Sequence, residues 1–171
     1  MKLATPLLLA LFAGACTQAL PTRADRDGVG YMRGDLDTVT SIDDRLYDAY
    51  GYFDGYSSHL EVHALGDYGW AMVGVDLYGA EFGSGPLAPG ETLTIYSDGT
   101  TSAEEEEVGG SGIGCSGPDY GDFAYDEPSQ EIGLSVDTDP VTGELIIDII
   151  ADFGDAGVVE ASVPMNGVSV Y

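Results

Sequence analysis

Strict alternation of apolar and polar residues constrains the fold of this chain more than any other feature. From Ser58 to Leu65, apolar residues alternate with His59, Glu61 and His63, and over 144–153 apolar residues recur at every second position. Successive side chains of a strand point to opposite faces of its sheet, so a period of two predicts a strand with one buried face. Both segments are therefore expected to be half-buried β-strands.

Further strand candidates follow along the chain, each bounded by Gly, Pro, Asp or Asn turn residues. They cover 46–53, 70–78, 92–96, 131–137, 158–163 and 167–171, with weaker signals at 111–115 and 120–125. Ser41 followed by Asp44 could instead cap a short helix over 42–50, but the alternation that continues to Phe53 favours a strand. About eight short strands in one domain predict an all-β, antiparallel β-sandwich, Ig-like or jelly-roll-like, rather than a barrel.

The chain is expected to divide into a short leader and one globular domain. Residues 1–15 are interpreted as a signal helix, 16–34 as a polar tether and 35–171 as a single acidic β-sandwich domain. Within the domain, 97–118 is expected to be a mobile Gly- and Glu-rich loop, because the four adjacent glutamates at 104–107 repel one another.

The charge of the chain is strongly one-sided. Its 171 residues include 30 acids and 5 bases, and no Lys or Arg follows Arg45. Such a surface repels nucleic acid and anionic lipid headgroups, since phosphate binding depends on Lys and Arg. Nucleic-acid binding is thereby excluded, whereas a basic protein, a carbohydrate or a divalent cation is compatible with the charge. A saline habitat would explain the same composition without any ligand.

The first 15 residues have the layout of an export signal. Lys2 precedes an uncharged stretch whose apolar core runs from Leu7 to Phe12, and small residues at 13–15 end it. The apolar core is about half the ~20 residues that a helix needs to cross a bilayer. We expect the segment to be removed on export, which places the mature domain outside the cytoplasm.

The segment from Ala13 to Cys16 resembles the lipobox of bacterial lipoprotein precursors. In that family the cysteine thiol is diacylated and becomes the new N-terminus, which implies a lipid anchor at Cys16. The segment departs from the commonest family pattern at Ala13, where Leu is usual, and it would also suit the ordinary signal peptidase. Thr17 in place of Asp implies the outer membrane or cell surface under the family's sorting tendency.

The role of the second cysteine depends on the first. If Cys16 carries lipid, Cys115 has no intramolecular partner; if Cys16 stays a thiol, a disulfide between the two is open in an oxidising compartment. Cys115 lies in a Gly-rich stretch without a neighbouring base, so a catalytic thiolate is not predicted and a small buried residue is expected.

His59-x-Glu61-x-His63 is the motif closest to a metal site. The three side chains fall on one face of the predicted strand, with ~6.6 Å between alternate residues. The two histidines would be ~13 Å apart, so only Glu61 with one histidine could bind the same zinc ion. A plain solvent-facing row explains the same residues.

Asp137, Asp139 and Glu144 form a weak match to a calcium-binding loop, and calcium is the candidate cofactor. The segment lacks the fifth-position ligand and sixth-position glycine of an EF-hand. A hairpin turn accounts for the same residues, because Pro140 has a preset φ and Gly143 adopts positive φ without strain.

Two other motif matches lack the context they need. The glycines of 112–117 match the dinucleotide-binding fingerprint, but Pro118 and Asp119 follow where a helix should begin. Residues 33–35 spell the integrin-binding tripeptide Arg-Gly-Asp, three common residues that coincide often by chance.

No catalytic motif is found. No nucleophile elbow surrounds a serine, and a glycosidase pair of carboxylates is defined by a spatial separation that sequence does not show. The sequence predicts a non-enzymatic, lipid-anchored protein of the cell envelope with a binding or structural role. The alternatives are a secreted polysaccharide-acting hydrolase with an Asp/Glu pair and a calcium-binding surface module.

Overall fold

The structure, a computed structural model, describes residues 30–36, 39–45, 48–66, 69–104, 107–117, 125–165 and 169–170. Within these ranges the chain is nearly all β-strand, with the short 3₁₀ helices η2 (Gly85–Leu87) and η3 (Gly154–Ala156). No helix in the described ranges is long and apolar enough to cross a membrane. The predicted all-β class is confirmed.

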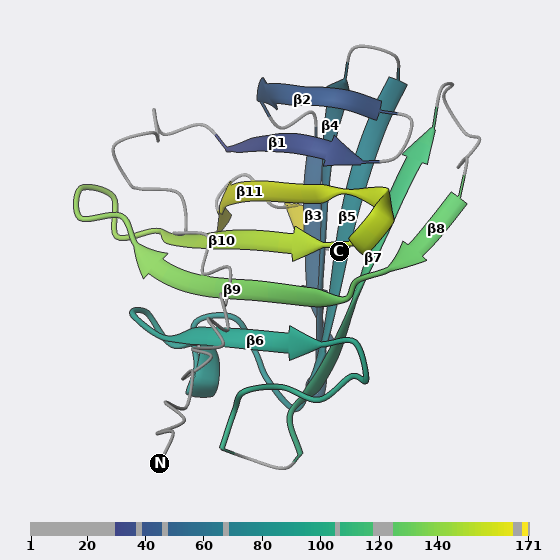
Figure 1. Cartoon of the computed structure of the whole chain (residues 1–171). Helices are drawn as coiled ribbons and strands as arrows, with labels where there is room; N and C mark the ends of the chain where they lie inside the picture. The colour runs from purple at the N-terminus through teal and green to yellow at the C-terminus, as the bar shows by residue number, and fades with distance from the viewer. Residues whose placement is uncertain are drawn as a thin grey trace, which may run out of the picture.

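The described strands form two six-stranded sheets that pack face to face (Figure 1). Sheet A has the order β2 (Val39–Arg45), β1 (Tyr31–Leu36), β11 (Val158–Pro164), β10 (Leu145–Asp152), β9 (Glu131–Thr138), β6 (Thr92–Tyr96). Sheet B has the order β12 (Ser169–Val170), β3 (Asp48–Phe53), β4 (Ser57–Gly66), β5 (Gly69–Tyr78), β7 (Gly109–Gly117), β8 (Tyr125–Pro128). Neighbouring strands are antiparallel except β12 and β3. In Figure 1 the strands of sheet A run across the view, whereas β3, β4 and β5 run up and down behind them.

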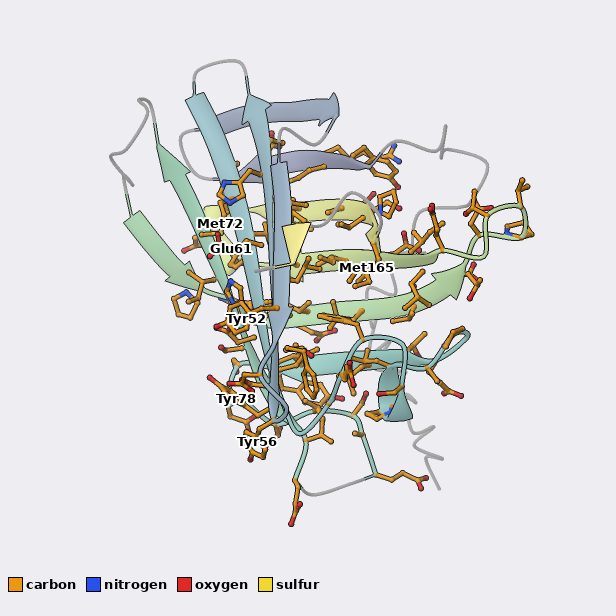
Figure 2. The ribbon with its side chains drawn as sticks, turned by 180° about the vertical axis from the view of Figure 1, so that it is seen from behind. Tyr52, Tyr56, Glu61, Met72, Tyr78 and Met165 are labelled. Carbon is orange, nitrogen blue, oxygen red and sulfur yellow. The ribbon has the colours of Figure 1, made fainter. Side chains whose placement is uncertain are left out.

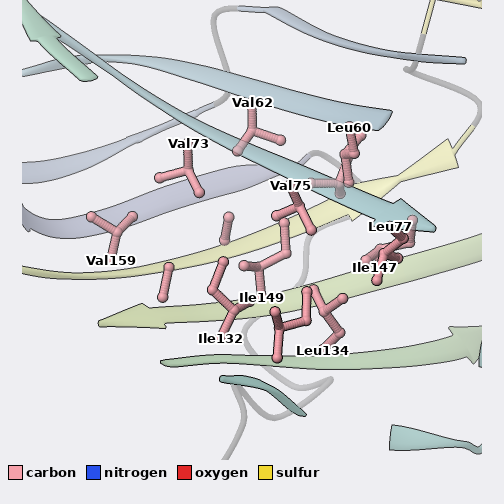
Figure 3. Close-up of a cluster of buried hydrophobic side chains, with 14 of the residues drawn as sticks. Leu60, Val62, Val73, Val75, Leu77, Ile132, Leu134, Ile147, Ile149 and Val159 are labelled. Carbon is pink, nitrogen blue, oxygen red and sulfur yellow. The ribbon is translucent and has the colours of Figure 1, made fainter. Parts of the chain in front are cut away.

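The core lies between the two sheets and is built from alternate residues of the facing strands (Figure 3). Leu60 and Val62 of β4 point inward, as the sequence predicts, and belong to the same buried cluster as Ile147 and Ile149 of β10. Full burial of such a side chain contributes about 1.5–3 kcal/mol of transfer free energy. The inward rows therefore account for both the pairing of the sheets and the alternation in the sequence.

The predicted strand segments lie close to the observed ones. Segments 58–65, 70–78, 92–96, 131–137, 144–153 and 158–163 correspond to β4, β5, β6, β9, β10 and β11. A helix over 42–50 is ruled out, because 42–45 belong to β2 and 48–50 to β3. Of the predicted strand 120–125, only Tyr125 lies within the described residues, where it begins β8.

The expected loop at 97–118 is wrong over 109–117, because these residues form β7, an interior strand of sheet B. Glycine has a low strand propensity, so only the weak strand signal at 111–115 marked this strand in the sequence. The glycines are needed for packing: a Cβ at Gly114 would lie 3.0 Å from ring atoms of Phe153, and one at Gly112 would overlap Ile132. The dinucleotide fingerprint is therefore a glycine-rich strand rather than a strand-to-helix turn.

The predicted domain boundary after residue 34 is too late, because β1 begins at Tyr31 and pairs with both β2 and β11. Met32 and Leu36 of β1 are buried in the core. A register irregularity between Gly34 and Leu36 interrupts the period of two, so the sequence pattern misses this strand. The Arg-Gly-Asp match at 33–35 is part of β1, which pairs with strands on both sides.

Candidate functional site

The outer face of sheet B brings the predicted histidine motif together with a residue that the motif does not contain. His59 of β4 lies opposite Asp76 of β5, and its Nδ1 is 2.5 Å from Asp76 Oδ1. Its Nε2 is 3.1 Å from Glu61 Oε1, while His63 Nε2 is 3.2 Å from Glu61 Oε2. The result is one hydrogen-bonded row that runs along β4 and crosses to β5.

Tyr52 extends this row from β4 to β3. Its ring stacks on the ring of His59 with centroids 5.1 Å apart and planes inclined by 23°. The register places Tyr52 beside His59, so cross-strand pairing between β3 and β4 creates the contact. Asp76 is the only acidic residue in the predicted strand 70–78, which is the one signal in the sequence that could have singled it out. Strand order was needed to place it beside His59.

The polar atoms of this row engage one another rather than converge on a point. Each ring nitrogen of His59 faces a carboxylate oxygen, and Glu61 divides its two oxygens between the two histidines. Among the described residues, no group of three or more His, Cys, Asp or Glu side chains is arranged to hold a metal ion. The row is therefore a hydrogen-bonded surface of the sheet.

A pocket with a volume of about 600 Å³ opens at the end of sheet B, where β5 ends and β7 begins. Its walls combine two aromatic rings with hydroxyl and carboxylate groups from Tyr56, Tyr78, Thr100, Thr101, Glu104 and Glu107. Tyr56 is 64% exposed and Tyr78 45% exposed. Figure 2 shows both tyrosines at one end of the sheet, with Tyr52 and Glu61 farther along. The sequence analysis did not identify this pocket.

Side-chain hydrogen bonds fix the turn that carries Tyr56. Asp54 Oδ1 accepts hydrogen bonds from the backbone N–H groups of Ser57 at 2.7 Å and Tyr56 at 3.0 Å. These bonds stabilise the carboxylate and hold the pKa of Asp54 below its ordinary value. Gly55 supplies the positive φ, 89°, that the turn requires. The Tyr56 side of the pocket is thus built on a defined hairpin.

A second Asp-based turn shapes the opposite wall. Asp98 Oδ1 accepts hydrogen bonds from the hydroxyl of Thr100 at 2.6 Å and from its backbone N–H at 3.0 Å, and the pKa of Asp98 is lowered as a result. The hydroxyl of Thr101 donates to the carbonyl of Val108 over 3.1 Å. The segment from 98 to 101 is thereby tied to the strand that begins at 109.

The proposed calcium residues form the turn between β9 and β10. Asp139 Oδ1 accepts hydrogen bonds from the backbone N–H groups of Val141 at 2.7 Å and Thr142 at 3.0 Å. Asp137 Oδ1 accepts one from the backbone N–H of Thr138, and Gly143 has φ 76°. The hairpin-turn interpretation is confirmed, and calcium binding at Glu144 gains no support from the metal-site geometry of the described residues.

The predicted lipidation site falls outside this description. Cys16 lies outside the described residues, as do the other residues up to 29, and so does the side chain of Cys115, whose backbone belongs to β7. The alternatives of acylation and of a disulfide between these cysteines therefore remain predictions of the sequence.

Comparison with known proteins adds no family to this picture. No family model matches the chain, and no curated protein or solved structure matches it. The functional conclusion therefore rests on the geometry of the sandwich and of the pocket formed by Tyr56, Tyr78 and their neighbours.

Proposed function

We propose that this protein is a non-enzymatic binding module of the bacterial cell envelope, and that its ligand is an uncharged carbohydrate held in the Tyr56–Tyr78 pocket. The observation that carries the proposal is the pair of exposed tyrosines in a concave site lined by hydroxyls and carboxylates. Pockets that combine aromatic surface with a few polar groups are the usual form of a small-ligand site.

The aromatic and polar walls of the pocket match the C–H faces and the hydroxyl groups of a sugar. The faces of Tyr56 and Tyr78 offer apolar area to the C–H groups of a pyranose ring, while their phenolic hydroxyls remain available to donate or accept. The carboxylates of Glu104 and Glu107 and the hydroxyl of Thr100 provide acceptors and a donor for sugar hydroxyls. An uncharged polyhydroxylated ring uses both surfaces.

The charge of the protein narrows the carbohydrate class. The sequence has 30 acidic residues and 5 Lys or Arg residues, and no Lys or Arg follows Arg45. The protein would therefore repel an anionic polysaccharide. The row formed by Tyr52, His59 and Glu61 continues along the same face of sheet B (Figure 2). This continuity favours an extended neutral glycan over a single sugar.

The proposal of a binding role without catalysis follows from the same pocket. Glu104 and Glu107 are both exposed, and neither is enclosed in an apolar pocket. Turnover of the bound glycan would contradict the non-enzymatic assignment and favour the hydrolase alternative.

Replacing Tyr56 or Tyr78 by alanine is expected to weaken glycan binding about tenfold each, since loss of a stacked aromatic anchor costs on the order of 1.4 kcal/mol. The measurement is affinity electrophoresis and calorimetry with neutral polysaccharides, including cellulose oligomers, xylan, mannan and chitin oligomers. Tyr96→Ala is the matched control, because Tyr96 is similarly exposed but lies outside the pocket lining.

Two results would contradict the carbohydrate proposal. One is failure of every neutral polysaccharide to bind, and the other is unchanged binding in the double variant of Tyr56 and Tyr78. Salt separates this ligand class from a basic protein. Neutral-glycan affinity should stay the same between 0.1 and 1 M NaCl, where the screening length falls from ~10 Å to ~3 Å, whereas binding of a basic partner should be lost.

The envelope location rests on the N-terminal sequence, in which an export signal ends at the lipobox-like Cys16. We expect the exported protein to incorporate a fatty-acid analogue during metabolic labelling and Cys16→Ser to abolish the label. Cys115→Ser is the matched control and should label normally. Equal labelling of the wild type and Cys16→Ser would refute the anchor while leaving the glycan proposal intact.

A further inference from the structure

A second, smaller pocket lies along β3 and β4 of sheet B. It has a volume of about 180 Å³ and shares no lining residue with the Tyr56–Tyr78 pocket among the described residues. Three aromatic rings, a thioether and a carboxylate line it, from Tyr52, Phe53, Phe82, Met165 and Glu81. In Figure 2, Tyr52 and Met165 lie on either side of β3. This pocket, named here the Phe53–Glu81 pocket, is therefore built where three distant segments of the chain meet.

Hydrogen bonds and packing hold the segment that carries Glu81 and Phe82. Ser58 is only 2% exposed, and its hydroxyl donates to the carbonyl of Ala80 over 3.0 Å. The backbone N–H of Ser84 donates to the carbonyl of Glu81 over 3.1 Å. The ring of Phe82 packs against the hydrophobic core. The walls are therefore in place before a ligand arrives, which lowers the entropic cost of binding.

The charge of the pocket favours a cation. Glu81 is exposed, and within the described part of the chain its carboxylate has no hydrogen-bond or ion-pair partner. The lining histidine, His59, faces the carboxylates of Asp76 and Glu61. No Lys or Arg follows Arg45 in the sequence, so the surrounding field is negative as well.

The walls favour a cation whose own surface is apolar. A cation over the face of an aromatic ring is attracted by the quadrupole of the ring, and aromatic cages bind quaternary ammonium groups in this way. A primary ammonium instead requires acceptors for three N–H donors, and the Ser58 hydroxyl of this pocket already bonds to Ala80. A cavity of ~150 Å³ holds a benzene molecule, so this pocket has room for a ligand of similar size.

We propose that the Phe53–Glu81 pocket binds a small, free quaternary ammonium ion of the choline class, with Glu81 as its counter-ion and Phe53 and Phe82 as its aromatic walls. The acidic surface favours a free cation over a zwitterion, because the anionic group of a zwitterion would be repelled. The site is separate from the glycan pocket, so the two proposals stand or fall independently.

An NMR titration of the whole purified protein at constant ionic strength tests the ligand class. Choline should bind saturably with a Kd of ~1 mM or tighter, a reasonable affinity for so small a ligand. Its neutral analogue, in which carbon replaces the nitrogen, should bind at least about tenfold more weakly, since it has the shape of choline without the charge. Equal binding of the neutral analogue, or no saturable binding of choline, would overturn the proposal.

Two further ligands identify the other possible occupants. Butylammonium has the headgroup of a lysine side chain, and phosphocholine adds a phosphate to the same quaternary group. Both should bind more weakly than choline. Tighter binding of butylammonium would overturn the proposal in favour of a basic protein, and tighter binding of phosphocholine would overturn it in favour of a lipid headgroup.

Variants of the wall residues locate the site. Glu81→Gln and Phe53→Ala should each weaken choline binding about fivefold, and both side chains are exposed, so the fold should be retained. Glu91→Gln is the matched control, because Glu91 is exposed but lies outside the pocket lining, and it should leave the affinity unchanged. An equal loss in Glu91→Gln would indicate general charge attraction and overturn the proposal, as would unchanged affinity in the double variant of Glu81 and Phe53.

The same variants separate this site from the glycan pocket. Glu81→Gln should weaken choline binding and leave glycan binding unchanged, whereas Tyr78→Ala should do the reverse. Loss of glycan binding by every neutral polysaccharide, with choline binding intact, would contradict only the glycan proposal. If one variant loses both ligands through a change of fold, the comparison of choline with its neutral analogue on the wild type decides the outcome.

Discussion

Replacing Gly34 by alanine should lower the free energy of unfolding by about 3 kcal/mol, a large effect for the addition of one methyl group. Gly34 has φ 124°, and a Cβ there would lie 2.2 Å from the carbonyl oxygen of Val158 and 3.1 Å from the Cα of Val159. These are backbone atoms of the paired strand β11, so no side-chain rotation relieves the overlap. The β1–β11 pairing must shift or separate.

Gly157 makes this contact reciprocal, because its φ is 130° and a Cβ there would lie 2.2 Å from the carbonyl oxygen of Asp35. Urea unfolding followed by tryptophan fluorescence gives the free energy for each variant. Gly133→Ala is the control within a strand, since no neighbouring heavy atom lies within 4 Å of its Cβ position, and it should change stability by less than about 1 kcal/mol. Equal stability of the Gly34 and Gly133 variants would refute the close-approach argument.

Replacing Phe153 by alanine should cost about 4 kcal/mol of stability, at the upper end for a buried large-to-small change. Phe153 is among the largest fully buried side chains and lies against the glycine face of β7. Glycines have no side chains that can move into the resulting cavity, so the cavity should remain largely open. Phe53→Ala removes the same atoms from a ring that is 43% exposed and should cost less than about 1 kcal/mol.

A double-mutant cycle connects Phe153 to the glycine strand. Gly114→Ala alone should be destabilising, because its Cβ would lie 3.0 Å from two atoms of the Phe153 ring. In the Phe153→Ala background the same methyl group enters the vacated space, so its cost should vanish or change sign. Additive effects of the two changes would show that β7 is glycine-rich for a reason other than this contact.

The sequence predicted the parts of the fold in which one strand face is buried. In β4 and β10 the apolar period of two gave the right strands, the right inward residues and the sandwich class. This succeeds because core burial requires an apolar residue at each inward position, which is every second residue of a strand. The hairpin at 138–144 was equally predictable, since Asp139 and Gly143 meet local turn requirements.

Strands whose composition is set by contacts with residues distant in the sequence were harder to predict. β7 is glycine-rich because Ile132 and Phe153, from other parts of the chain, occupy the space beneath it. β1 is interrupted by Gly34 because Val158 approaches it closely. In both strands the requirement comes from the opposing backbone or core, so it leaves no periodic signal in the local sequence.

By itself, the sequence determined the β class, the acidic charge, and the row of His59, Glu61 and His63 on one face of a strand. Tertiary structure decided what those residues meet. Strand order set Asp76 beside His59, and the closure of the β3–β4 turn brought Tyr56 next to Tyr78 and Glu107. The physical reason is that alternation encodes which face a side chain occupies, whereas contacts between strands depend on register and order, which arise only when the two sheets pair and pack.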